Sequence, residues 1–359
     1  MLQATDAMPS RSGTPHAASP ASPAMDDRPT TVSATVDLDA EGVQHGFLKL
    51  PYSHDDSAWG CIMIPITVVR NGVGPTALLT GGNHGDEYEG ITALLKLANV
   101  LRAEEVQGRV IIVPMMNHPA VLAGKRTSPI DKGNMNRSFP GSPYGTMTER
   151  IADYFQRFLI PACDFALDIH SGGRTLDILP FAAAHRLPDK AQEQKCIAAA
   201  RAFGTPATMI LFELDAASLY DTAVESQGKV FVSTELRGGG TSTPATQRLA
   251  DRGVRNFLKF AGILEGEPEA PEAPRYLLDM PDASCYVQSS HRGILEMLHD
   301  LGDTVRHGEV VARIHDMERC GVPPVEYRAE RDGMIVARRF PALTGMGDTI
   351  LVLADVVAS

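Results

Sequence analysis

The stretch Thr80-Gly81-Gly82-Asn83-His84-Gly85-Asp86-Glu87 directly follows an apolar run, Thr76–Leu79, that is typical of a buried strand. It places His84 and Glu87 three residues apart, so the two side chains can point the same way if a helix begins there. Two histidines and one glutamate form the ligand set of hydrolytic zinc sites, which keep one position open for water. Because a lone His-x-x-Glu pair is common by chance, the stretch needs further ligands elsewhere in the chain.

The chain from about residue 60 alternates short β-rich runs with helical patterns, which predicts an α/β domain. The predicted strands are Cys61–Val69, Thr76–Thr80, Val110–Met115, Phe165–Ile169, Thr208–Leu214 and Val230–Glu235. The predicted helices between them are Tyr88–Ala103, Thr148–Phe158 and Ala191–Phe203. Glycine pairs or triplets follow three of the strands and allow tight turns or a close approach to a ligand. Because ligands in open α/β sheets bind beyond the carboxyl ends of the strands, we expect the site there.

Composition divides the chain into four parts. Residues 1–30 are rich in Ala, Ser, Pro and Thr without an apolar signal region, which predicts a disordered tail, and Met25 is an alternative start to Met1. Residues 31–262 form the predicted catalytic domain, including an N-terminal β segment, and the Pro/Glu-rich residues 263–275 predict a linker. Residues 276–359 show short apolar runs punctuated by glycine, which predicts a small all-β domain.

Charge and cysteine usage exclude several classes of partner. The chain of 359 residues has a net charge of −11, which argues against nucleic acid or an anionic membrane as the main partner. No apolar run approaches the roughly 20 residues needed to span a bilayer. The five cysteines are scattered and form no Cys-x-x-Cys pair, which predicts reduced thiols in a cytoplasmic protein rather than a thiolate metal site.

Two further strand ends carry candidate chemistry. His170 ends an apolar run just before a glycine pair, where a capping role is the alternative to ligation, and with His84 and Glu87 it completes a zinc ligand set. Glu235 ends another apolar strand. A buried carboxylate beside an activated water can take the proton of that water and return it to a leaving amine. A salt bridge to Arg237 is the alternative for Glu235.

A polar, loop-like segment, Asn117–Gly141, contains Arg126 and the run Asn136-Arg137-Ser-Phe-Pro-Gly. An arginine forks onto a carboxylate through two parallel hydrogen bonds, which suits recognition of a free α-carboxylate. A second arginine can stabilise the oxyanion that forms when water attacks a carbonyl. A surface loop with solvated arginines is the alternative.

Four motifs occur in order, Gly82–Glu87, Asn136–Gly141, Asp168–Gly172 and Thr234-Glu235, and together they resemble the succinylglutamate desuccinylase/aspartoacylase family. The resemblance covers roughly residues 60 to 262, and the trailing β segment also matches the architecture of that family. It implies a zinc-carboxypeptidase-like mixed α/β sheet flanked by helices, with a small C-terminal all-β, barrel-sandwich-like domain. It also implies one Zn²⁺ per chain bound by His84, Glu87 and His170, Glu235 as the base, Asn136 and Arg137 on the substrate carboxylate, and Arg126 polarising the scissile carbonyl.

The segments Gly42–Gly46, Pro51–Gly60 and Lys125–Asp131 most resemble the deacetylases of ectoine degradation within this family, which act on N(α)-acetyl-L-2,4-diaminobutyrate. A small-molecule N-acyl amino acid is thus the expected partner, and self-association, such as a dimer, is implied. A cationic γ-amine would need an acidic wall, for which Asp177, Glu213 and Asp215 are candidates. N-acetylaspartate or N-succinylglutamate as substrate, a peptide-trimming carboxypeptidase and a non-catalytic binding protein are the alternatives.

Overall fold

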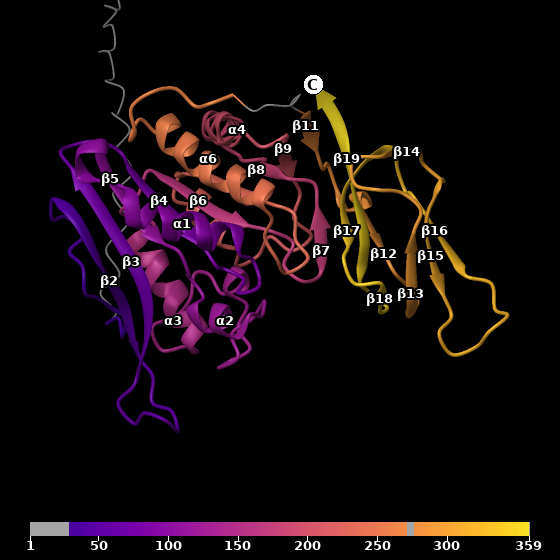
Figure 1. Cartoon of the computed structure of the whole chain (residues 1–359), viewed down its shortest axis with the longest axis horizontal. Helices are drawn as coiled ribbons and strands as arrows, with labels where there is room; N and C mark the ends of the chain where they lie inside the picture. Colours follow the sequence, from indigo (N-terminus) through magenta and orange to yellow (C-terminus); the bar gives the residue numbers. More distant parts are fainter. Residues whose placement is uncertain (1–28, 271–275, 359) are drawn as a thin grey trace, which may run out of the picture.

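The computed structural model describes residues 29–270 and 276–358 (Figure 1). The predicted tail and Met25 therefore lie almost entirely outside the described residues, as does the end of the predicted linker. The α-helices of the described part are α1 (Glu89–Val100), α2 (His118–Ala123), α3 (Met147–Tyr154), α4 (Lys190–Phe203), α5 (Tyr220–Glu225) and α6 (Pro244–Phe260). Shorter helical turns are η1 (Ala103–Glu105), η2 (Met135–Arg137), η4 (Ala283–Cys285) and η3 (Phe155–Leu159), a π-helical continuation of α3.

One mixed sheet runs through the molecule in the order β1-β2-β3-β5-β4-β6-β10-β8-β9 and then continues into the C-terminal region. These strands are β1 (Ser33–Ala34), β2 (Gly42–Pro51), β3 (Cys61–Asn71), β4 (Thr76–Gly81), β5 (Gly108–Val113), β6 (Phe165–His170), β8 (Phe181–His185), β9 (Ala207–Leu211) and β10 (Val230–Glu235). Strands β5, β4, β6 and β10 are parallel neighbours, so their carboxyl ends meet at one edge. That edge carries the predicted site.

Helices cover both faces of this sheet. Because successive side chains of a strand point to opposite faces and both faces are buried, the central strands are apolar throughout. On β4, Leu79 points into a core shared with α1, α4 and α6, while its neighbour Leu78 points into a second core shared with α3 and α5. Val232 and Phe231 divide between the same two cores on β10. Figure 1 shows α1, α4 and α6 together on one side of the sheet and α3 on the other. The central strands are therefore held rigidly beneath the site.

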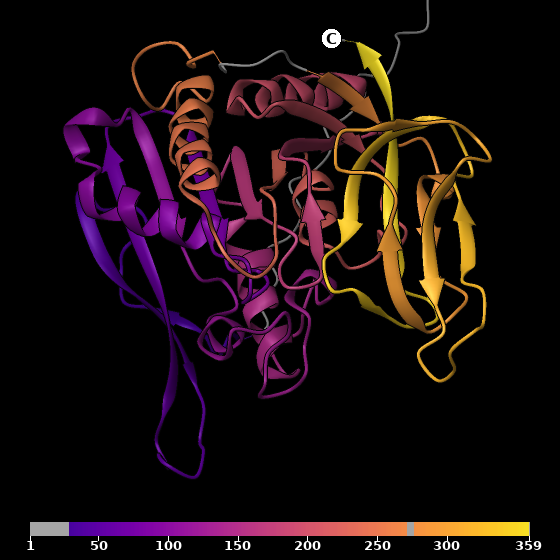
Figure 2. The same cartoon turned by 45° about the vertical axis from the view of Figure 1, so that its right-hand side comes forward.

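The C-terminal region adds strands to the edge of this sheet and forms a second sheet (Figure 2). The added strands are β11 (Tyr276–Asp279), β12 (Tyr286–Gln288), β14 (Thr304–Val305), β17 (Gly333–Arg339) and β19 (Thr349–Ala358). The second sheet contains β13 (Gly293–Met297), β15 (Val310–His315), β16 (Val325–Arg328) and β18 (Leu343–Thr344). Strand β11 pairs with β9, and β7 (Leu176–Ile178) pairs with β17, so the two regions share backbone hydrogen bonds.

Two local predictions need correction. The segment Asn117–Gly141 is not wholly a loop, because α2 begins beside Pro119 and ends at Gly124 with φ +55°. Proline in the first turn and a left-handed glycine after the last are ordinary helix boundaries. Strand β8 was not predicted, since its sequence, Phe-Ala-Ala-Ala-His, is rich in a helix-forming residue. Pairing with β10 on one side and β9 on the other overrides that local preference.

Two further observations concern membranes and thiols. Among the described residues, no helix is both long enough and apolar enough to cross a bilayer. All five cysteines are free, with Cys163, Cys196 and Cys285 buried, so the expected unpaired thiols are found. Burial raises the pKa of the Cys163 thiol to about 12, which makes that thiol unreactive.

Candidate active site

The residues after β4 form a tight turn rather than the start of a helix, because α1 begins only at Glu89. Gly85 permits this turn, since a Cβ there would lie 2.0 Å from the carbonyl carbon of Ala120. The turn brings Nδ1 of His84 within 2.8 Å of Oε1 of Glu87. The expected proximity of these two side chains is therefore found, although it comes from a turn and not from helical spacing.

His170, the last residue of β6, completes the cluster. Its Nδ1 atom lies 2.9 Å from Oε2 of Glu87, so the Nδ1 atoms of two histidines approach one carboxylate. All three residues are buried, and one ligand atom from each lies within 4.8 Å of the others. Two imidazole nitrogens and a carboxylate are the protein ligands of many catalytic zinc sites. The donor set and its convergence thus fit a zinc ion.

The outer nitrogens of both histidines also have partners. Oδ2 of Asp168 lies 2.7 Å from Nε2 of His170, and the Thr80 hydroxyl donates to Oδ1 of Asp168 at 2.7 Å. Oδ1 of Asn134 lies 3.2 Å from Nε2 of His84. Partners of this kind select which imidazole nitrogen is left to bind a metal, here Nδ1 in both rings.

Sequence reasoning assigned no role to Asp168 or Asn134. For Asp168 a signal existed, because residues two apart on a strand share a face and Asp168 precedes His170 by two on β6. Asn134 gave no such signal, since it lies 50 positions from His84 on a separate loop.

Burial and charge set the protonation of the cluster. Burial raises the pKa of Glu87, but the charges of His84 and His170 outweigh it and leave the pKa well below its usual value. Burial lowers the pKa of His84, which favours the neutral ring. Burial also acts to lower the pKa of His170, yet the carboxylates of Asp168 and Glu87 raise it overall. Ionised Glu87 and neutral His84 are in the states that a metal requires, whereas a metal would have to displace a proton from His170.

Glu235 lies beside the cluster, because β10 pairs with β6 in a register that opposes Glu235 to His170. Its Oε2 atom is buried with no hydrogen-bond partner among the described residues. Burial, reinforced by the charge of Glu87, raises the pKa of Glu235 to about 8. The alternative salt bridge to Arg237 is not found, since Nε of Arg237 lies 3.3 Å from Oδ1 of Asp177 instead.

The three remaining predicted residues lie on the segment between α2 and α3. Nη1 of Arg126 lies 3.2 Å from Nδ1 of His84 and 3.6 Å from Oε1 of Glu87, so this side chain reaches the cluster. Oδ1 of Asn136 accepts a hydrogen bond of 3.1 Å from the backbone of Tyr220. Arg137 is oriented by its own neighbour, because its Nη1 donates to the carbonyl oxygen of Asn136 at 2.8 Å. The assigned roles of these residues remain predictions.

Two of the three acidic-wall candidates, Asp177 and Asp215, form ion pairs with arginines. Asp177 is paired with Arg237 and with Nη2 of Arg338 at 3.1 Å. Asp215 is exposed and lies 3.5 Å from Nε of Arg137. Glu213 borders a cavity of about 630 Å³ that also contains a second His/acid cluster, formed with His185 and Asp221.

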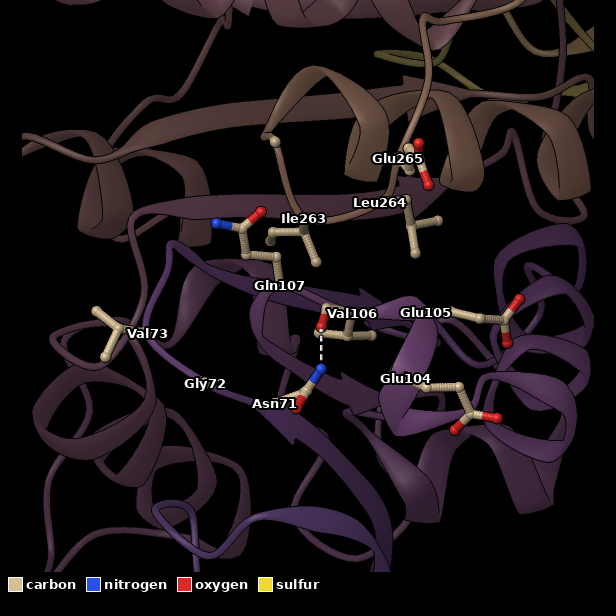
Figure 3. Close-up of a pocket in the computed structure, with 11 residues that line it drawn as sticks. Asn71, Gly72, Val73, Glu104, Glu105, Val106, Gln107, Ile263, Leu264 and Glu265 are labelled. Atoms are coloured by element: carbon tan, nitrogen blue, oxygen red, sulfur yellow. Dashed lines mark hydrogen bonds between the residues drawn. The ribbon is translucent and has the colours of Figure 1, made fainter.

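A further cavity, of about 700 Å³, lies away from all of these residues (Figure 3). It is lined by Asn71, Gln107 and Glu265 among others, and the side-chain amide of Asn71 donates to the carbonyl oxygen of Val106 at 3.0 Å. Asn71 pairs with Gly108 at the beginning of β5. This cavity is therefore at the amino ends of the parallel strands, opposite the candidate site, and size alone does not identify the site.

Comparison with known proteins agrees with this geometry. The model of the succinylglutamate desuccinylase/aspartoacylase catalytic domain matches residues 73–261. N-alpha-acetyl-L-2,4-diaminobutyric acid deacetylase from Halomonas elongata is 65% identical over 332 residues, which cover 92% of this chain and 97% of that protein.

Solved structures of the same family are also similar to this chain. The product-bound ectoine utilization protein EutE (DoeB) from Ruegeria pomeroyi is 56% identical with a TM-score of 0.89, covering 91% of this chain and 99% of that one. A succinylglutamate desuccinylase from Silicibacter sp. TM1040 is 55% identical with a TM-score of 0.88, covering 92% and 99%.

The fold and these likenesses define a mixed α/β enzyme fold with an antiparallel C-terminal sheet, as the sequence predicts. The chain belongs to the succinylglutamate desuccinylase/aspartoacylase family.

Proposed function

We propose that this chain is a zinc-dependent deacylase that hydrolyses N(α)-acetyl-L-2,4-diaminobutyrate to acetate and L-2,4-diaminobutyrate. One observation carries the proposal: the Nδ1 atoms of His84 and His170 approach the same buried carboxylate, and Oε2 of Glu235 on the neighbouring strand has no hydrogen-bond partner among the described residues. The substrate is supported by the relative from Halomonas elongata, which is named as a deacetylase of this compound. The ectoine utilization protein from Ruegeria pomeroyi supports the same metabolic context.

His84, Glu87 and His170 would hold one zinc ion per chain. Zinc bound there would supply Lewis acidity, which polarises an amide carbonyl and makes water a nucleophile near neutral pH. Asp168 and Asn134 fix the two imidazole rings through their Nε2 atoms, so that Nδ1 is the ligand atom of each. The rings are then oriented before substrate arrives.

Glu235 acts as the general base and then as the general acid. Its buried Oε2 atom has no hydrogen-bond partner among the described residues and is available to accept a proton from the attacking water. Glu235 delivers that proton to the amine nitrogen as the carbon–nitrogen bond breaks. Its pKa of about 8, raised by burial, lies close to the pH range in which one group can serve in both roles.

Arginines on the α2–α3 segment position the substrate. Arg126, within 3.6 Å of Glu87, donates to the oxyanion as the carbonyl becomes tetrahedral. Loss of one such donor typically costs about 10²–10³ in rate. Arg137, with Asn136 beside it, holds the α-carboxylate, because a guanidinium can form two parallel bonds to a carboxylate.

A hydrolysis panel on zinc-loaded enzyme tests the proposal. It compares N(α)-acetyl-diaminobutyrate with its N(γ) isomer, N-acetylaspartate, N-succinylglutamate and a dipeptide, and we expect the first to give the highest kcat/KM. Faster cleavage of the dipeptide would identify a carboxypeptidase instead. No hydrolysis, together with no stoichiometric metal in protein purified without chelator, would identify a binding protein.

We also propose a cytoplasmic location and self-association. The five free cysteines support the first, because disulfides are rare in reducing compartments. The dimer rests on family resemblance alone, and sedimentation of the purified protein would test it.

A further inference from the structure

A second cavity lies beside the candidate site and has a distinct chemical character. It has a volume of about 630 Å³, and its lining comes from the end of β8, the chain after β9 and helix α5. Four of its lining side chains are histidine or carboxylate: His185, Glu213, Asp221 and Glu225. Arg186 also borders the cavity, but its guanidinium pairs with Asp279. The cavity is therefore acidic.

The hydrogen bonds inside the cavity leave carboxylate capacity unused. Nδ1 of His185 lies 3.0 Å from Oε1 of Glu225, so one carboxylate is paired with the imidazole. Nε2 of His185 is buried without a hydrogen-bond partner in the described part of the chain, and Oδ2 of Asp221 lies 4.0 Å away, beyond hydrogen-bonding distance. The other oxygen of Asp221 accepts from Thr222. Within the described ranges, Oδ2 of Asp221 and the carboxylate of Glu213 are therefore available to receive a cation.

The cavity is connected to the predicted carboxylate-binding residues. The chain after β9 carries Glu213 and, two positions on, Asp215, which lies 3.5 Å from Nε of Arg137. Helix α5 carries Asp221, and its first residue, Tyr220, donates to Asn136. The same two segments thus contact the predicted carboxylate-binding pair and line the acidic cavity.

The cavity also lies on the sheet face that carries Glu235. Strands β10 and β8 pair so that Ser233 opposes Ala183 and Glu235 opposes Phe181. Because alternate residues share a face, His185 points to the same side of the sheet as Ala183, Ser233 and Glu235. Ser233 and the fully buried Ala183 lie between Glu235 and His185 on this face of the two strands. Glu235 and His185 are therefore on neighbouring strands and on the same face of the sheet.

We propose that this cavity binds the side-chain ammonium of the substrate, with Glu213 and Asp221 as acceptors, and so selects N-acyl amino acids whose side chain ends in a primary amine. This inference rests on the proposed function and assigns the specificity of the same site. An ammonium has three donors and no acceptor, so carboxylates with unused oxygens recognise it and a methyl group in its place leaves them unpaired. The α-carboxylate at Arg137 and the ammonium in the cavity then fix the amide between them.

The test uses Glu213→Gln and Asp221→Asn, which keep the shape of each side chain and remove its charge. Two substrates are compared on zinc-loaded enzyme: N(α)-acetyl-diaminobutyrate and N-acetylnorvaline, in which a methyl group replaces the ammonium. We expect the wild-type preference for the cationic substrate in kcat/KM to fall by about 30-fold or more in each variant, while kcat/KM for N-acetylnorvaline is little changed. The matched control is Glu104→Gln, because Glu104 is an exposed carboxylate that pairs with Arg102 at the cavity of Figure 3. This variant should keep the wild-type preference for the cationic substrate.

Calorimetry of the binding of L-2,4-diaminobutyrate and L-norvaline to the same proteins tests the ammonium site separately from the proposed deacylase function. If no N-acyl amino acid is hydrolysed, the proposed function fails, yet tighter binding of diaminobutyrate that is lost in Glu213→Gln would still support the ammonium site. Equal binding of the two amino acids by the wild type would overturn the ammonium site. A second metal ion per chain that is lost in Asp221→Asn, with the substrate preference intact, would also overturn it and identify the cavity as a metal site.

Discussion

Two clusters of histidine and carboxylate lie on this protein, and they differ in which atoms are left to bind a ligand. At the ends of β4 and β6, two histidines offer Nδ1 to one carboxylate, and their Nε2 atoms are held by Asn134 and Asp168. In the acidic cavity, a single histidine, His185, is surrounded by carboxylates. The first arrangement offers lone pairs on nitrogen, and the second offers oxygen acceptors around one ring.

Protonation sharpens the contrast. Burial lowers the pKa of His84, which keeps a lone pair available for a metal. Burial also acts to lower the pKa of His185, but its hydrogen bond to Glu225 and the nearby carboxylates raise that pKa to about 9. The carboxylates of Asp168 and Glu87 raise the pKa of His170 as well, so a metal bound there would have to displace a proton. The contrast therefore rests on His84, whose neutral ring converges with His170 on Glu87 and suits a metal ion, whereas the single histidine among carboxylates suits an ammonium.

Metal content should separate the clusters most strongly. His84→Ala removes one of three ligands, so we expect zinc measured by atomic emission to fall from one ion per chain to a small fraction after dialysis against a weak chelator. His185→Gln should keep its zinc, because His185 is not a ligand. Loss of zinc in His185→Gln but not in His84→Ala would reverse the assignment of the two clusters.

Glu235→Gln should lower kcat by about 10²–10⁴, the usual contribution of general acid–base catalysis, while zinc content stays at the wild-type level. The amide keeps the shape of the side chain but cannot accept the proton of water. The kcat is measured in stopped assays at saturating substrate, and the zinc content is determined on the same sample. Near-normal turnover with zinc bound would remove Glu235 from the mechanism.

How far the sequence predicts the site follows from where each residue lies. His84, Glu87, His170 and Glu235 stand at the ends of apolar strands, and a parallel sheet brings such ends together, so their convergence could be predicted from local patterns. The acidic cavity could not be predicted from local patterns, because the three alanines of β8 favour a helix over a strand. Without β8, nothing in the sequence placed His185 beside α5, although Glu213 was already a candidate by its position.

The fold shows the same division between local and long-range information. Helices α1 and α4 agree with the predicted ranges to within a few residues, since amphipathic spacing and caps are local. The pairing of β7 with β17 joins residues more than 150 positions apart, and no local pattern encodes it. Sequence patterns therefore predicted a separate C-terminal β region but not its continuity with the catalytic sheet.

The smallest expected effect concerns stability and pH at His185. Its pKa in the folded protein, about 9, is raised above the ordinary 6.5, so its proton stabilises the fold fully below about pH 6.5, and this stabilisation is lost as pH rises through 9. The unfolding free energy of wild type minus that of His185→Gln should fall by at most about 3 kcal/mol between pH 6 and pH 10, measured by urea denaturation at fixed excess zinc. Contributions common to both proteins cancel in this difference. Glu225 accepts the hydrogen bond from His185, and Asp221 and Glu213 also face the imidazole ring. With Glu225→Gln in both proteins, the difference in unfolding free energy should therefore depend much less on pH. If the wild-type difference does not change with pH, His185 is neutral in the folded protein.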